Sequence, residues 1–190
     1  IIDLTKTVEG LEKALPAITK AVESGRKVLF VGTKKQVKEA VREAAESVKQ
    51  PYVVERWVGG MLTNSATVNQ QIKKLKTLEK RMESGELSKR YSKLEVQRYA
   101  EEIEALNTKY GGIKDLMGRP GILFVTDAIA DANAIREAKT LNIPVVAIVD
   151  TNVNPDGIDY VIPANDDAIK GVKLLLDYAI EAIKEAKTDK

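Results

Sequence analysis

Runs made only of apolar residues constrain the fold of this chain more than any other feature of its sequence. Three of them, at 28–31, 122–125 and 144–149, are four to six residues long, and shorter ones lie at 52–54 and 160–162. A strand that is apolar on both faces has to be covered on both sides, which is characteristic of parallel sheets in α/β proteins. We therefore predict an α/β fold whose parallel sheet has about five strands and is covered by helices on both sides.

Segments with apolar residues at helical spacing lie between these runs. They predict helices over 5–24, over 34–49, after the third long strand candidate, and in a last segment capped by Asp166 or Asp167. Pro16 lies inside the first helix, so a kink or a restart is expected there.

The segment 64–110 differs from the rest of the chain because charged residues dominate it and apolar residues are sparse. Its apolar residues recur at steps of three and four in two runs on either side of Gly85, and the second run has the spacing of a coiled-coil seam. We predict an antiparallel helical hairpin with arms of about 20 residues, each roughly 30 Å long. Thr63 or Asn64 is expected to cap its first arm.

This hairpin defines the predicted domain organisation. Residues 1–63 and 111–190 are expected to form one globular α/β domain, and residues 64–110 are expected to be an insertion in it. Gly111 and Gly112 are expected to close the insertion.

The composition excludes several classes of site. The chain has no Cys and no His, so it lacks the commonest zinc ligands, disulfides, and any Ser-His-Asp triad or Cys-His dyad. It also lacks an apolar run of the length that spans a membrane, and its start does not resemble a secretory signal. Catalysis would have to rest on carboxylates, Lys, Arg, Tyr, Ser or Thr.

Charge is distributed unevenly along the chain. Residues 1–63 and 64–110 each carry a net charge of +3, whereas residues 111–190 carry −4. On the first arm of the hairpin, Lys73, Lys74 and Lys76 have few acidic neighbours. This arm is either a solvated helix face or a surface that lies along a phosphate backbone.

Two further basic positions are candidates for phosphate contacts. Lys34 and Lys35 follow Gly32 between a strand and a helix, where phosphate loops lie, but neither standard nucleotide-binding glycine motif is present. The alternative is a tight turn with solvated lysines. In the Gly-rich segment 56–64, we expect Arg56 to contact phosphate, and Trp57 either to pack at the base of the hairpin or to stack on a base.

Acidic residues end two of the predicted strands. Asp127 and Asp150, with Asn152 nearby, would lie at the carboxyl edge of the sheet, where α/β proteins bind ligands. They either hold Mg²⁺ or a small molecule, which would suit a Mg-dependent enzyme or a small-molecule-binding domain, or make local turns. The turn interpretation is favoured.

Five segments in one order carry a resemblance to a known family. Residues 56–64, RWVGGMLTN, are similar to the RWxGGxLTN signature of the small-subunit ribosomal protein S-two family. Its other characteristic segments match IDLTKT at 2–7, FVGTK at 30–34, GGIKD at 111–115, and residues 143–167. The chain departs from the family in Ala164, where Gly is common, in residues 126–131, and in lacking the His-rich segment that usually precedes IIDL.

The resemblance implies a three-layer, flavodoxin-like α/β/α domain with an inserted helical coiled coil. It implies a structural constituent of the small ribosomal subunit, located between head and body, in the cytoplasm or in an organelle. The expected partners are small-subunit ribosomal RNA and neighbouring ribosomal proteins, in bacteria including ribosomal protein S-one, with no catalysis, cofactor, membrane or small-molecule substrate. The expected RNA contacts are Lys34, Lys35, Arg56, Lys73, Lys74 and Lys76, and the residues expected to structure the loop are Trp57, Gly59, Gly60 and Asn64.

Overall fold

Five parallel strands form the sheet of the computed structural model, which describes residues 2–188. In space the order is β2-β1-β3-β4-β5, the order of flavodoxin-like folds, so the α/β prediction with about five parallel strands is confirmed. The strands are β1 (Val28–Val31), β2 (Tyr52–Val53), β3 (Ile122–Val125), β4 (Val145–Val149) and β5 (Tyr160–Pro163).

Alternate residues of each strand belong to different cores, as the period of two in a strand requires. Phe30 and Phe124 are paired across β1 and β3 on one face, with ring centroids 5.5 Å apart. Leu29 and Leu123 point to the other face. Both sets are buried, which explains why these strands are apolar throughout.

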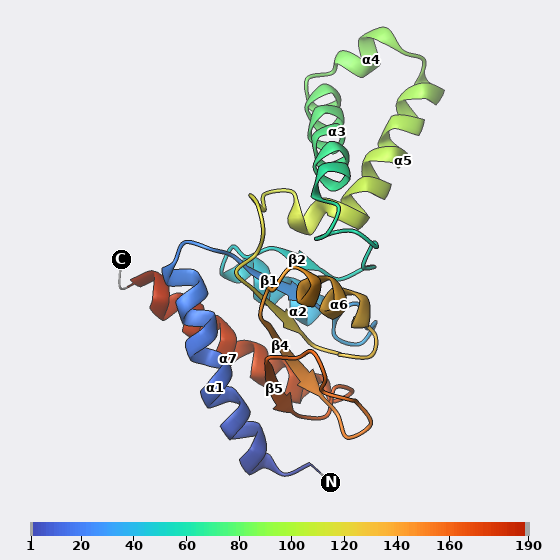
Figure 1. The fold of residues 1–190 in the computed structure, drawn as a ribbon. Coiled ribbons are helices and arrows are strands. Elements are labelled where there is room, and N and C mark those ends of the chain that lie inside the picture. Colours follow the sequence, from blue (N-terminus) through green and yellow to red (C-terminus); the bar gives the residue numbers. More distant parts are fainter. Residues whose placement is uncertain (1, 189–190) are drawn as a thin grey trace.

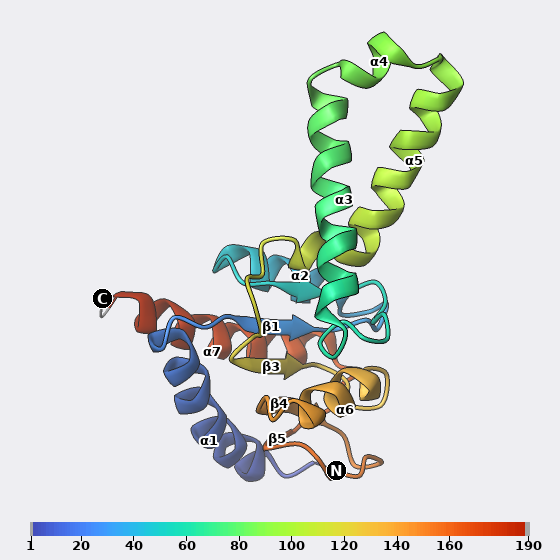
Figure 2. The same cartoon turned by 45° about the horizontal axis from the view of Figure 1, so that its top comes forward.

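Three helices cover the first face and one covers the second (Figures 1 and 2). The first set is α1 (Leu4–Glu23), α2 (Lys38–Ser47) and α7 (Ile169–Thr188). The second face is covered by α6 (Ala132–Thr140), together with the base of the helical hairpin. No helix of residues 2–188 combines the length and apolar character that crossing a membrane requires.

The hairpin projects from the edge of the sheet at which β2 lies (Figure 2). Its arms are α3 (Ser65–Glu83) and α5 (Lys93–Tyr110), joined by a short helix, α4 (Glu86–Arg90), and followed by the 3-10 turn η1 (Gly111–Ile113). Leu87 of α4 is fully buried, and Ser92 begins α5 with a capping box.

Three local expectations need correction. The second helix begins at Lys38 and not at Lys34, because the chain first turns around the contacts of Lys34 described below. The first helix continues through Pro16 without a restart, held by its packing on α7 and β5. Asn64 occupies the N-cap position of α3, but its side chain makes no capping hydrogen bond.

Candidate nucleic-acid interface

One carboxylate organises the loop that leads into the hairpin. Glu137, on α6, accepts hydrogen bonds from the indole Nε1 of Trp57 at 3.1 Å and from the backbone N–H of Gly60 at 2.7 Å on the same oxygen. Its other oxygen accepts from the backbone N–H groups of Leu62 at 3.0 Å and Thr63 at 3.2 Å, and from the Thr63 hydroxyl at 3.2 Å. Residues 57–63 are therefore wrapped around one side chain, which we call the Glu137 clamp.

The residues expected to structure this loop take different parts in it. Trp57 is buried and packs against the second core, which is the packing role and not the stacking one. Gly60 has φ of +87°, a conformation that favours glycine. Gly59 is exposed, and a Cβ there would meet no atom within 4 Å. The backbone N–H of Asn64 donates to the carbonyl of Gly60 at 2.8 Å, so the clamp passes directly into α3.

The clamp changes the acidity of its central group. Burial alone would raise the pKa of Glu137, but the hydrogen bonds from Trp57, Gly60, Leu62 and Thr63 outweigh it and hold the pKa below its ordinary value of 4.5. A carboxyl whose folded-state pKa is depressed stabilises the fold above its unfolded-state pKa, and this contribution is lost as pH falls through the folded-state value.

We therefore expect acid to remove the stability that the clamp contributes. The free energy of unfolding of the native chain minus that of a Glu137→Gln variant should be constant above about pH 5 and shrink at lower pH. Taking the difference removes Asp131 and Asp166, whose pKa values are raised by burial and whose effect on stability has the opposite sign. A difference that stays constant between pH 6 and pH 3 would contradict this assignment; urea unfolding across the range measures it.

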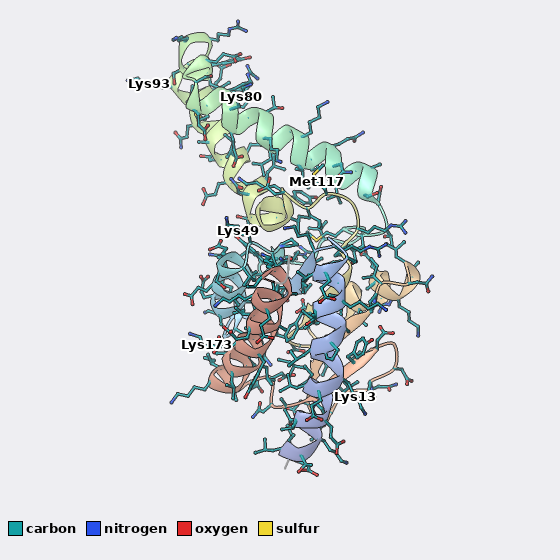
Figure 3. The ribbon with its side chains drawn as sticks, turned by 90° about the vertical axis from the view of Figure 1, so that its left-hand side faces the viewer. Lys13, Lys49, Lys80, Lys93, Met117 and Lys173 are labelled. Atoms are coloured by element: carbon teal, nitrogen blue, oxygen red, sulfur yellow. The ribbon has the colours of Figure 1, made fainter. Side chains whose placement is uncertain are left out.

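Three basic residues of the first arm share one exposed face of α3. Lys73, Lys76 and Lys80 follow one another at helical spacing on an exposed face, and Leu75 and Leu78 are buried on the other side. Figure 3 labels Lys80 towards the hairpin tip, away from the sheet. We call this exposed set the α3 basic stripe.

Two of the arm's lysines already have acidic partners. Lys76 pairs with the highly exposed Asp115 at 3.0 Å, and Lys74 pairs with Glu102 of α5. Exposed pairs of this kind are weak and exchange readily with other anions. Both side chains thus remain accessible from solvent.

The basic residues near the strand ends differ in how accessible their charges are. Lys35 and Arg56 are exposed, whereas the ammonium of Lys34 is held by Asp127 and Asp166, both at 3.1 Å, and by Asp167. These contacts, that of Asp167 above all, raise the pKa of Lys34. A phosphate would have to compete with three carboxylates for this side chain.

The acidic strand ends make local contacts. Asp127 accepts from the backbone N–H groups of Ile129 and Ala130, both at 2.9 Å, in addition to its pair with Lys34. Asp150 accepts from the N–H of Thr151 at 2.6 Å. Residues 2–188 contain no group of three or more acidic side chains arranged to hold a metal ion. The contacts at this edge therefore support the turn interpretation of Asp127 and Asp150.

Glu137 is the site residue that sequence reasoning missed. One signal was present: Glu137 lies on the same helical face as Ala134, Ala138 and Leu141, so it is a charge within the apolar face of an amphipathic helix. A carboxylate in that position needs hydrogen-bond donors from elsewhere in the chain.

Comparisons with a family model and with curated proteins all point to one family. The family model of "Ribosomal protein S2", the S-two family named above, matches residues 1–186. The "Small ribosomal subunit protein uS2" of Tolumonas auensis is 50% identical over 187 residues, which are 98% of this chain and 77% of that protein. Proteins of the same name from Idiomarina loihiensis and Vibrio cholerae are also 50% identical, over 188 and 187 residues and 77% of their lengths.

Proposed function

Because this chain belongs to the ribosomal protein S2 family, we propose that its hairpin and the loop at 56–64 are the parts that dock on small-subunit ribosomal RNA. The chain is a structural component of the small ribosomal subunit and not an enzyme. It acts in the ribosomes of the cytoplasm, and its partners are ribosomal RNA and neighbouring ribosomal proteins.

The observation that supports this docking surface is the α3 basic stripe. Three lysines on one exposed helix face, carried away from the sheet by the hairpin, can each approach a phosphate without displacing core packing. Lys35, shortly after the end of β1, and Arg56, in the loop that leads into the hairpin, are both exposed and are assigned to the same surface, together with Lys74. Lys34 is assigned a structural role, because its charge is compensated by Asp127, Asp166 and Asp167.

Most of the remaining surface is proposed to face proteins. Residues 111–190 carry a net charge of −4, which disfavours contact with a phosphate backbone. In this assignment residues 1–63 and 111–190 form the globular domain, residues 64–110 form the RNA-facing insertion, and ribosomal protein S-one is one of the protein partners of the acidic part.

Co-sedimentation with small ribosomal subunits tests the docking. Tagged chain is added to subunits depleted of their own copy of this protein, at low and then at moderate salt. We expect stoichiometric association that survives moderate salt, because specific docking adds packing and hydrogen bonds to the phosphate contacts. Association at low salt only would show a non-specific electrostatic attraction and contradict the proposal.

A further inference from the structure

Four helices of residues 2–188 are followed by a residue in the left-handed conformation, and after one of them this residue is unusual. It is Gly25 after α1 with φ of 78°, Lys49 after α2 with φ of 55°, Gly85 after α3 with φ of 72° and Asn142 after α6 with φ of 54°. Gly and Asn are the residues that this position favours. A Lys there costs free energy because its Cβ crowds the backbone, so the fold alone gives no reason for its presence.

The backbone hydrogen bonds that end α2 form in spite of this residue. The N–H of Gln50 donates to the carbonyl of Ala45 at 2.9 Å, and the N–H of Lys49 donates to that of Glu46 at 3.1 Å. A glycine at position 49 would make the same two hydrogen bonds without the strain. What the lysine adds is a long side chain that carries a positive charge.

Two further lysines converge on the same turn. The ammonium of Lys27, just before β1, donates to the carbonyl of Lys49 at 3.3 Å, and that of Lys187, near the end of α7, donates to the carbonyl of Val48. Within residues 2–188, none of the three lysines lies within salt-bridge distance of a carboxylate. The pKa of Lys187 is lowered by burial and then by the positive charges of Lys27 and Lys49, which shows that the three ammonium groups lie close enough to repel one another.

An open hollow lies beside this cluster, between the end of α2 and the base of the hairpin, where Figure 3 labels Lys49. Its volume is about 470 Å³, and Lys27, Lys49, Pro51, Tyr52 and Gly111 are among the residues that line it. Two carboxylates also line it: Glu46, which accepts from the hydroxyl of Tyr52 at 2.8 Å, and Asp115, whose charge is paired with Lys76 at 3.0 Å.

We propose that Lys27, Lys49 and Lys187 form a second phosphate-binding site, which holds the backbone of small-subunit ribosomal RNA at the amino ends of β1 and β2. This inference rests on the proposed function, and it adds a contact at the end of the sheet opposite to the loop at 56–64. Capping of the two carbonyls that follow α2, those of Val48 and Lys49, would account for Lys27 and Lys187. Capping does not account for Lys49. A contact between its ammonium group and a phosphate would explain why a lysine occupies this strained position.

A Lys49→Gly variant tests the use of the ammonium group. Relief of strain should raise the stability of the fold, whereas loss of a phosphate contact should lower the affinity for RNA. We expect its thermal midpoint to rise, since glycine relieves the left-handed strain. We expect its binding to small ribosomal subunits depleted of their own copy of this protein to weaken, with the slope of log Kobs against log salt becoming shallower by about 0.7–0.9, the value of one phosphate contact. Adding Lys27→Gln and Lys187→Gln should make the slope shallower by about 2.1–2.7 in total, the value of three phosphate contacts.

A control variant and changes to the α3 basic stripe show whether the second site or the proposed function fails. A Lys13→Gln, Lys173→Gln variant removes exposed charges on α1 and α7, at positions that Figure 3 labels away from Lys49, and should leave the slope unchanged. A higher midpoint with an unchanged slope in Lys49→Gly would overturn the second site, while loss of binding on changing the α3 basic stripe would still support the proposed function. A native chain that does not associate with the depleted subunits at all would overturn both.

Discussion

Replacing Glu137 with alanine is expected to lower the free energy of unfolding by about 3 kcal/mol, because hydrogen-bond donors of the 57–63 loop lose a charged acceptor together. The Trp57 indole N–H and the backbone N–H groups of Gly60, Leu62 and Thr63 all point at this carboxylate. The loop would have to open towards water to satisfy them, and opening would expose Trp57, which is 8% exposed in the folded chain.

Glu55 offers a matched control for this substitution. Its carboxylate accepts from Lys38 at 3.0 Å and from Arg42 at 3.2 Å, and its side chain is 33% exposed. These partners are long cationic side chains that regain water when Glu55→Ala removes their acceptor, so the expected loss is below about 1 kcal/mol. Urea unfolding of both variants measures the difference, and equal losses would show that Glu137 is an ordinary surface carboxylate.

Loss of the clamp is also expected to release the hairpin from its fixed orientation. The chain contains no Cys, so spin labels on cysteines placed at Lys80 and Lys173 give one unambiguous distance. We expect a narrow distribution in the native chain and in Glu55→Ala, and a broad one in Glu137→Ala. A narrow distribution in all three would mean that the packing of Leu62 and Val68 against the second core orients the hairpin without Glu137.

Features that depend on neighbouring residues could be predicted from the sequence, whereas contacts between residues far apart in the chain could not. The strands at 28–31 and 122–125 are predictable because a strand buried on both faces has to be apolar at every position. The hairpin is predictable because its spacing is a local property of each arm. The short helix at the tip, Glu86–Arg90, is too short for its periodicity to be recognised.

The site depends instead on partners far apart in the sequence. Lys34 was a candidate phosphate contact because it follows a strand and a glycine, yet its partners Asp127 and Asp166 come from the ends of other strands. Glu137 lies more than 70 residues from the backbone groups that it binds. No local sequence pattern predicts contacts between residues so far apart in the chain, because the strand order of the folded sheet brings them together.

Reversing Lys73, Lys74 and Lys76 to glutamate is expected to weaken binding to small-subunit ribosomal RNA on the order of 100-fold at moderate salt, because three favourable phosphate interactions become repulsive. The fold should tolerate the change, since all three side chains are exposed and the lost pairs with Glu102 and Asp115 are surface pairs. Incorporation into small subunits should fall in parallel.

The control for this reversal keeps the same change in net charge but moves it to another surface. Lys20, Lys170 and Lys173 are exposed on α1 and α7, and reversing them should reduce RNA affinity only through the weak, screened effect of overall charge. Salt titrations of both variants separate local from overall charge, because only phosphate contacts change the slope of log Kobs. If the α3 variant kept its slope and still entered subunits at moderate salt, the hairpin would be a protein-facing or solvent-exposed arm, and the RNA contacts would have to lie at Lys35, Arg56 and the lysines around the end of α2.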